Sequence, residues 1–267
     1  MNIIDFQKMK DVNIKISMVT CYDYWSAKII AETDIDCVLV GDSLAMVMHG
    51  HATTIPAKVE IIALHIQAVA KGVQNKFIIG DLPFCSYRKS ISETMHAVEK
   101  IMQAGANAVK LEGANGTESV INHVVYSGVP VMGHIGMTPQ SIHQLGGFCV
   151  QGKDQASAET LIGQALRLEK AGCFAIVLEC IPNAVAKNIT DKLTIPTIGI
   201  GAGPNVSGQV LVLHDLLGMY DTFKAKFVKS YINGHALIQN ALNEYNKEVK
   251  QLQFPSQQHS YGAKEND

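Results

Sequence analysis

The sequence lacks an excess of charge of either sign, and it has no apolar run long enough to cross a membrane. Its 22 basic and 24 acidic side chains give a formal net charge of −2, which provides no broad basic field for nucleic acid or for an anionic membrane surface. The N-terminus is polar and has no secretory apolar segment. We therefore expect a cytoplasmic protein whose partners are small molecules, with no nucleic acid and no membrane.

Cofactor signatures built on cysteine, histidine or glycine are also weak. The six cysteines are scattered and form no CxxC pair, so we expect buried thiols in a reducing compartment. His49 and His51 lie in a loop with no third histidine or cysteine nearby, which makes a weak zinc signal. The glycine-rich residues 199–203 resemble a dinucleotide-binding turn only superficially, because they come late in the chain and lack the acid that should follow.

The sequence has no linker and no internal repeat longer than a strand followed by a helix. With 267 residues, of which 47% are hydrophobic, the chain can bury a sizeable core in one domain. Strand-like and helix-like segments alternate from residue 15 to a last strand at residues 209–214 and a final helix over about residues 227–251. We predict an α/β fold, a (βα)8 TIM barrel over residues 1–262 with a frayed tail at 263–267, and an open doubly wound sheet as the main alternative.

What the sequence does have is a series of apolar runs that each finish on a carboxylate. Residues 37–43 read Cys-Val-Leu-Val-Gly-Asp-Ser, a pattern typical of a buried parallel strand. The same pattern recurs, and the acids that close these runs are Asp42, Asp81, Glu112 and Glu179. A single acid at the end of a strand can simply be the N-cap of the next helix. Several such acids would lie together if the sheet is a closed barrel, because all its strands then end at one mouth. We therefore expect these four acids to converge.

Lys110 and Glu112 lie two residues apart on the fourth predicted strand. This spacing places both side chains on one face, directed into the barrel mouth. Opposite charges on a buried strand face indicate either a functional site or a structural ion pair, and the sequence leaves both interpretations open.

Residues 137–152 form a long segment that is rich in glycine. Such a loop is uncommon inside a compact domain unless it folds over a site. Gly146, Gly147 and Gly152 bracket its second half, and we predict a lid that is mobile without ligand and ordered with it.

Nine short stretches, in order along nearly the whole chain, resemble the 3-methyl-2-oxobutanoate hydroxymethyltransferase family, also called ketopantoate hydroxymethyltransferase. They are residues 18–24, 40–43, 50–51, 80–84, 109–113, 133–141, 178–182, 199–203 and 213–215. The resemblance implies a barrel of the phosphoenolpyruvate/isocitrate lyase type. It also implies transfer of a hydroxymethyl group from 5,10-methylenetetrahydrofolate to 3-methyl-2-oxobutanoate (α-ketoisovalerate), which gives 2-dehydropantoate (ketopantoate) in pantothenate biosynthesis.

The same resemblance implies roles for individual residues. The residues that hold or orient one Mg²⁺ per subunit are Asp42, Asp81 and Glu112. The residues that contact the keto acid are Asp42, Ser43, Asp81 and Lys110. Glu179 matches the proton acceptor, and His134 lines the pocket beside the substrate. Relatives form homodecamers, so we expect a homo-oligomer.

These roles agree with elementary chemistry. An α-keto acid can chelate a hard cation, which prefers oxygen ligands and acidifies the C3–H beside the carbonyl. The sequence departs from the family pattern at Ala45, where we expect no effect, and at residues 148–149, where Phe-Cys leaves the lid without its usual basic residue. Two alternative functions remain. A lyase of the isocitrate lyase type would have a Lys-Lys-Cys-Gly-His run, which is absent here. In a catalytically silent barrel, some of the charged residues at the strand ends should have been replaced.

Overall fold

The computed structural model describes residues 1–220 and 225–262, and the chain divides into two compact units, residues 1–213 and 214–267. The tail predicted at residues 263–267 lies outside the described residues, and the assignment of residues 1–262 to one domain stays a prediction. In the described part of the chain, no helix is long and apolar enough to cross a membrane.

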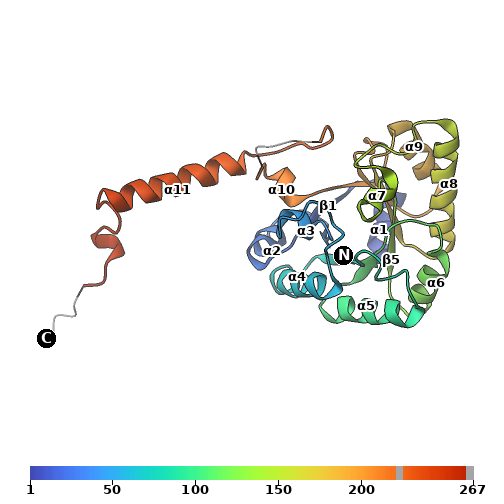
Figure 1. Ribbon diagram of the computed structural model, residues 1–267, viewed down its shortest axis with the longest axis horizontal. Coiled ribbons are helices and arrows are strands. Elements are labelled where there is room, and N and C mark those ends of the chain that lie inside the picture. The colour runs from blue at the N-terminus through green and yellow to red at the C-terminus, as the bar shows by residue number, and fades with distance from the viewer. Residues whose placement is uncertain (221–224, 263–267) are drawn as a thin grey trace. The chain divides into compact units, whose positions relative to one another are not determined.

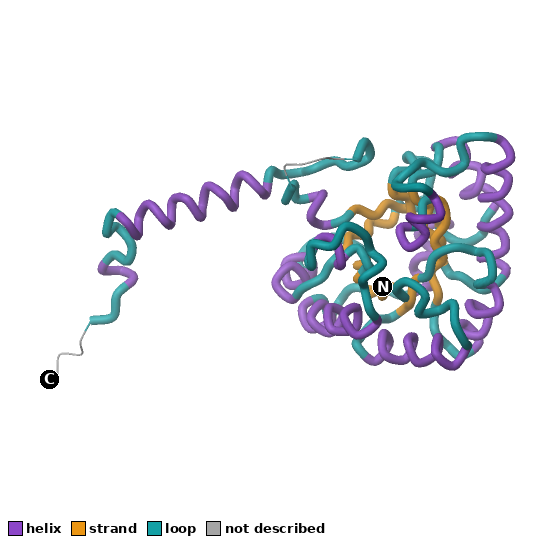
Figure 2. Tube along the Cα trace, in the orientation of Figure 1, coloured by secondary structure: helices purple, strands orange, loops and turns teal. Residues whose placement is uncertain are grey.

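The first unit is a closed barrel of eight parallel strands (Figure 2). Each strand pairs with the next along the chain, and the last pairs with the first. The strands are β1 (Ile16–Thr20), β2 (Cys37–Val40), β3 (Phe77–Asp81), β4 (Ala108–Lys110), β5 (Val131–Gly136), β6 (Ala175–Glu179), β7 (Thr197–Ile200) and β8 (Gly208–Leu211). The predicted barrel is confirmed, and the open doubly wound sheet is excluded.

Helices form the outer layer around this barrel, as Figure 1 shows for α4, α5, α6 and α8. The α-helices of the first unit, the last of which crosses into the second, are α1 (Ile3–Asp11), α2 (Tyr24–Ala31), α3 (Leu44–Val47), α4 (Val59–Gly72), α5 (Ile91–Gln103), α6 (Glu118–Tyr126), α7 (Ile142–Leu145), α8 (Gln155–Lys170), α9 (Asn183–Lys192) and α10 (Leu213–Leu216). The predicted last strand over residues 209–214 ends too late, because the chain leaves the sheet after Leu211 and the Leu213 N–H bonds the Thr20 hydroxyl at 2.9 Å.

The second unit contains one long helix, α11 (Gly234–Lys250), and the short 3₁₀ turn η2 (Gln257–His259). The predicted start of this helix at residue 227 is wrong. The Asn233 side chain accepts a hydrogen bond from the Ala236 N–H at 3.2 Å and caps the first turn there, as asparagine commonly does. Beyond the helix the ring of Phe254 packs against that of Tyr245, with centroids 5.6 Å apart.

All six cysteines are free thiols. The prediction that they are buried is confirmed for Cys21, Cys37 and Cys173. It is wrong for the half-buried cysteines, which are Cys85, Cys149 and Cys180.

A helix that the sequence pattern did not predict, α1, closes the barrel at the amino ends of its strands. Phe6 of α1 is completely buried in the central core cluster. Its ring packs edge to face against Phe77 and Phe174, with centroid distances of 5.5 and 5.2 Å. Aromatic side chains therefore fill this end of the barrel, and a ligand site is expected at the opposite end, where the strands finish.

We expect the substitution Phe6→Ala to lower the free energy of unfolding by about 3 to 5 kcal/mol, the usual range for removal of a buried aromatic ring. Chemical denaturation measures this loss. Ile4→Ala is the matched control, because Ile4 lies on the same helix with 61% of its surface exposed, and its effect should stay within about 0.5 kcal/mol. Equal effects of the two substitutions would contradict this account of the barrel floor.

Candidate functional site

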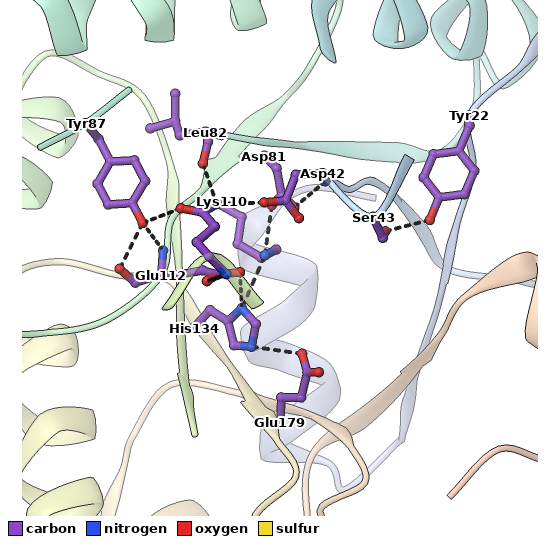
Figure 3. Close-up of polar contacts among 11 residues, drawn as sticks. Tyr22, Asp42, Ser43, Asp81, Leu82, Tyr87, Lys110, Glu112, His134 and Glu179 are labelled. Atoms are coloured by element: carbon purple, nitrogen blue, oxygen red, sulfur yellow. Dashed lines mark hydrogen bonds and ion pairs between the residues drawn. The ribbon is translucent and has the colours of Figure 1, made fainter. Parts of the chain in front are cut away.

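The barrel mouth gathers ionisable side chains from five neighbouring strand ends (Figure 3). Five of them are almost fully buried, namely Asp42, Asp81, Lys110, Glu112 and His134. The sixth, Glu179, is the last residue of β6, and 14% of its side chain is exposed. The expected convergence is therefore observed, and every acid predicted from a strand end belongs to one network.

Asp81 is the centre of the first half of this network. One of its carboxylate oxygens lies 2.8 Å from the Lys110 ammonium, and the other accepts a hydrogen bond from the Asp42 N–H at 2.9 Å. The register of the sheet explains the ion pair, because Asp81 and Lys110 are direct neighbours on β3 and β4. A Cβ atom at Gly41 would lie 2.9 Å from the Ser43 hydroxyl, so a larger residue there would displace that hydroxyl.

His134 is the centre of the second half. Its Nδ1 lies 3.4 Å from a Glu112 carboxylate oxygen, and its Nε2 lies 3.1 Å from a Glu179 carboxylate oxygen. Burial and the charge of Lys110 lower the pKa of His134, but the hydrogen bonds to Glu112 and Glu179 outweigh them and raise this pKa to about 9. The two carboxylates therefore favour the protonated form of His134, whose ring lies between Glu112 and Glu179.

Gln140 connects the predicted lid to the acids, and the sequence analysis did not assign it a role. It belongs to the 3₁₀ turn η1 (Pro139–Ser141), inside the segment of residues 137–152. Its backbone N–H bonds Glu112 at 3.0 Å, and its side-chain amide donates to Asp42 at 2.8 Å. The buried Tyr87 hydroxyl donates to the Gln140 side-chain oxygen at 2.9 Å. The segment is therefore partly ordered by η1 and α7, and it reaches into the site.

Ser43 lies beside Asp42 at the mouth and is half-buried. Its hydroxyl shares a hydrogen bond of 2.7 Å with the hydroxyl of Tyr22, a fully buried side chain that follows β1. Tyr22 is the second residue that sequence reasoning missed, although it lies within one of the motifs that carry the resemblance.

Burial and neighbouring charges shift the pKa values of these acids in different directions. Burial first, and then the charges of Asp81 and Glu112, raise the pKa of Asp42 well above its usual range. Burial also raises the pKa of Asp81, although the Lys110 ammonium opposes part of this shift. Burial opposes ionisation of Glu112 too, but the hydrogen bond and charge of His134 hold its pKa below the usual range. Asp42 and Asp81 therefore resist carrying two negative charges side by side, although the Lys110 ammonium favours the ionised form of each.

The chemistry of this donor set fits a hard divalent cation. Mg²⁺ prefers carboxylate oxygen and commonly takes only one or two carboxylates, with water and substrate completing its shell. Asp42 and Asp81 are adjacent and would gain from an added positive charge. Within residues 1–220 and 225–262, no group of three His, Cys, Asp or Glu side chains is arranged as a ligand cage, and Glu112 contacts Gln140 and His134 instead. The residues fit a metal bound by two aspartates, with Glu112 in an orienting role.

A cavity of about 840 Å³ adjoins the network. Its lining includes Gln140 and Gly136, and it extends to Phe84, Arg88 and His143. This volume lies within the usual range for small-molecule and cofactor sites. The mouth therefore has space for a second, larger ligand beside the buried acids.

Comparison with known proteins shows the family to which the chain is similar. The sequence model of the ketopantoate hydroxymethyltransferase family matches residues 1–257. The chain is 60% identical over 256 residues to the 3-methyl-2-oxobutanoate hydroxymethyltransferase of Coxiella burnetii (strain RSA 493 / Nine Mile phase I), covering 96% of each protein. It is 56% identical over 262 residues to the enzyme of the same name from Legionella pneumophila (strain Paris), covering 98% of this chain and 100% of that protein.

Solved structures show the same fold at low sequence identity. A 2,3-dimethylmalate lyase, described as a PEP mutase/isocitrate lyase superfamily member, superposes with a TM-score of 0.58 at 12% identity, covering 99% of this chain and 90% of that chain. A phosphonopyruvate hydrolase gives a TM-score of 0.63 at 11% identity, covering 99% and 92%. The predicted barrel type is confirmed.

Proposed function

Because the chain belongs to the ketopantoate hydroxymethyltransferase family of transferase enzymes, we propose that it transfers a hydroxymethyl group from 5,10-methylenetetrahydrofolate to 3-methyl-2-oxobutanoate through a metal-stabilised enolate. The product is 2-dehydropantoate, an intermediate of pantothenate biosynthesis. The observation that carries this proposal is the buried network of carboxylates, Lys110 and His134 at the barrel mouth (Figure 3).

Asp42 and Asp81 are the proposed magnesium ligands, and the keto acid contacts the same two residues together with Ser43 and Lys110. When bound there, Mg²⁺ supplies Lewis-acid polarisation of the keto carbonyl, which acidifies the neighbouring C3–H and stabilises the enolate. Lys110 is held by Asp81 at 2.8 Å, so its ammonium is a fixed positive charge that offsets the negative charge of the substrate and of the enolate.

Glu179 is the proposed proton acceptor. Among the acids of the network it has the most accessible side chain, with 14% exposed compared with 3% for Asp81 and Glu112. Glu179 is joined to neither aspartate in Figure 3, where the one contact drawn from its carboxylate is with His134. His134 positions the carboxylate, so Glu179 can take the C3 proton while the aspartates keep their own role.

The one-carbon donor requires a second binding region beside the keto acid. The cavity of about 840 Å³ that reaches from Gln140 to Phe84, Arg88 and His143 provides the space and a mixed aromatic and basic lining. We place the folate there. The family relationship also supports a cytoplasmic homodecamer with one Mg²⁺ in each subunit.

The proposal is tested by assaying the untagged protein with α-ketoisovalerate, 5,10-methylenetetrahydrofolate and Mg²⁺, and following the product by NMR. We expect ketopantoate to form only when all three are present, and EDTA to abolish its formation. A parallel assay with 2,3-dimethylmalate and isocitrate tests the lyase alternative. Carbon–carbon cleavage of either diacid without transfer to α-ketoisovalerate would overturn the proposal.

The lid gives a separate prediction. Gly146, Gly147 and Gly152 all have positive φ, at 74°, 120° and 78°, a conformation that glycine adopts without strain. We expect chymotrypsin to cleave after the exposed Phe148 at least about tenfold more slowly when Mg²⁺ and α-ketoisovalerate are bound, because ordered loops resist proteolysis. Cleavage after Tyr126, which is 85% exposed outside this segment, is the internal control. Equal protection of both sites, or of neither, argues against a lid.

A further inference from the structure

Two histidines face each other outside the acid network. His49 follows α3, and His65 lies on α4, sixteen residues later. Their Nε2 atoms are 3.0 Å apart, and their rings are nearly perpendicular with centroids separated by 5.3 Å. His49 is exposed and His65 is half-buried, so solvent reaches the pair. In the folded chain, His49 therefore pairs with His65, although His51 is its nearest histidine in the sequence.

A hydrogen bond to the backbone holds the His65 ring on the side that faces away from His49. Its Nδ1 bonds the backbone carbonyl of Tyr22, and a carbonyl can only accept a hydrogen bond, so Nδ1 carries the proton. In this tautomer the lone pair is on Nε2, the nitrogen that faces His49. A metal-binding histidine almost always has this arrangement, in which the far nitrogen donates to a carbonyl or carboxylate and thereby sets the tautomer.

The separation of the two nitrogens matches two ligands of one metal ion. With metal–nitrogen distances of about 2.0 to 2.1 Å, two imidazole nitrogens lie about 2.9 Å apart at a right angle and about 3.3 Å apart in a tetrahedron. The observed 3.0 Å lies between these values. The two nitrogens now share a hydrogen bond, and the exposed His49 ring has to turn so that its Nε2 faces an ion instead.

We propose that His49 and His65 form a second metal site, for a transition-metal cation of the zinc, nickel and copper class. Imidazole nitrogen suits these cations, whereas Mg²⁺ prefers the carboxylates of the barrel mouth. Water fills the remaining positions, because in the described part of the chain no third His, Cys, Asp or Glu joins a ligand group. This site does not depend on the proposed function.

The site also has a structural consequence. A bound ion joins α4, the segment after α3 and, through the Tyr22 carbonyl, the end of β1. The Tyr22 hydroxyl in turn contacts Ser43 at the mouth. Since binding to the folded state alone stabilises it by mass action, we expect the cation to raise the unfolding temperature as well as to bind.

Isothermal titration calorimetry of the untagged full chain with NiCl₂, in buffer with excess MgCl₂, tests this site. Nickel does not oxidise the free thiols, and a large excess of magnesium competes with it for the carboxylates of the barrel mouth. We expect one high-affinity Ni²⁺ per chain. Its affinity should fall at least about tenfold in His49→Gln and in His65→Gln, since losing even a supporting partner of a metal ligand costs about tenfold or more.

His51→Gln is the matched control, because it removes an exposed imidazole two residues from His49. It should keep the wild-type affinity and the wild-type nickel-dependent rise in unfolding temperature. His49→Gln serves as the main test, because His49 is exposed and its side chain contacts only His65 among the bonds described here. Unchanged nickel binding in His49→Gln shows that the pair is a hydrogen bond only. An equal loss in His51→Gln assigns the metal to a different ligand set, and either result overturns the proposal.

Discussion

The substitution Glu179→Gln is expected to lower ketopantoate formation by about a hundredfold to ten-thousandfold, the usual contribution of a general base. The amide keeps the shape of the side chain but cannot accept the C3 proton. Affinity for α-ketoisovalerate in Mg²⁺ should stay close to that of the wild type, because Asp42, Asp81 and Lys110 are untouched. Steady-state kinetics and calorimetric titration of the keto acid measure the two quantities separately.

Glu118→Gln provides a control for this result. Glu118 also makes one close ion pair, with Arg167 at 3.0 Å, and it lies on α6, outside the buried acid network. Its activity should equal that of the wild type. If Glu179→Gln lost keto-acid affinity and activity to the same extent, Glu179 would be a substrate-binding residue instead of the base.

The second large effect concerns the proposed magnesium ligands. In Asp42→Asn we expect metal-dependent binding of α-ketoisovalerate to weaken by at least about a hundredfold. Loss of a residue that only hydrogen-bonds a metal ligand costs less, about tenfold to a hundredfold in affinity. The fold should survive, because the asparagine oxygen can still accept the hydrogen bond that Gln140 donates to Asp42. Calorimetric titration with keto acid, in Mg²⁺ and in EDTA, measures the change.

Asp36→Asn is the matched control, since Asp36 precedes the opposite end of β2 and bonds Ser17 there. It should bind the keto acid like the wild type. Asp81→Ala is a less clean test, because it leaves the buried Lys110 ammonium without its partner, a change that commonly costs about 3 to 5 kcal/mol of stability. Metal-dependent affinity that is unchanged in Asp42→Asn would exclude Asp42 as a ligand.

The acids at the mouth could be found from the sequence because two regularities place them. A continuous apolar run predicts a strand buried on both faces, and closure of a parallel sheet brings every strand end to the same place. Asp42, Asp81, Glu112 and Glu179 therefore converge whatever the loops do. The ion partner of Lys110 was not predictable in this way, because it depends on the register between β3 and β4, which joins Lys110 to Asp81.

Features that depend on loops or on distant contacts were missed. Gln140 reaches Asp42 only because η1 turns its amide into the mouth, and Tyr22 reaches Ser43 across two strand ends. The pairing of His49 with His65 likewise requires α4 to pack beside the segment after α3. Helix α1 was overlooked because its pattern is mostly polar, and only Phe6, together with the half-buried Met9, packs against the core.

In the proposed reaction, Glu179 takes the C3 proton of a keto acid held by Asp42 and Asp81. Exchange of the C3 hydrogen of α-ketoisovalerate with deuterated water, followed by proton NMR without folate, isolates this step from the one-carbon transfer. We expect exchange by the wild-type enzyme only when a divalent cation is present, and loss of about a hundredfold or more in Glu179→Gln. Exchange at the wild-type rate in Glu179→Gln, together with no ketopantoate formation, would contradict this expectation and assign Glu179 to the transfer of the one-carbon unit.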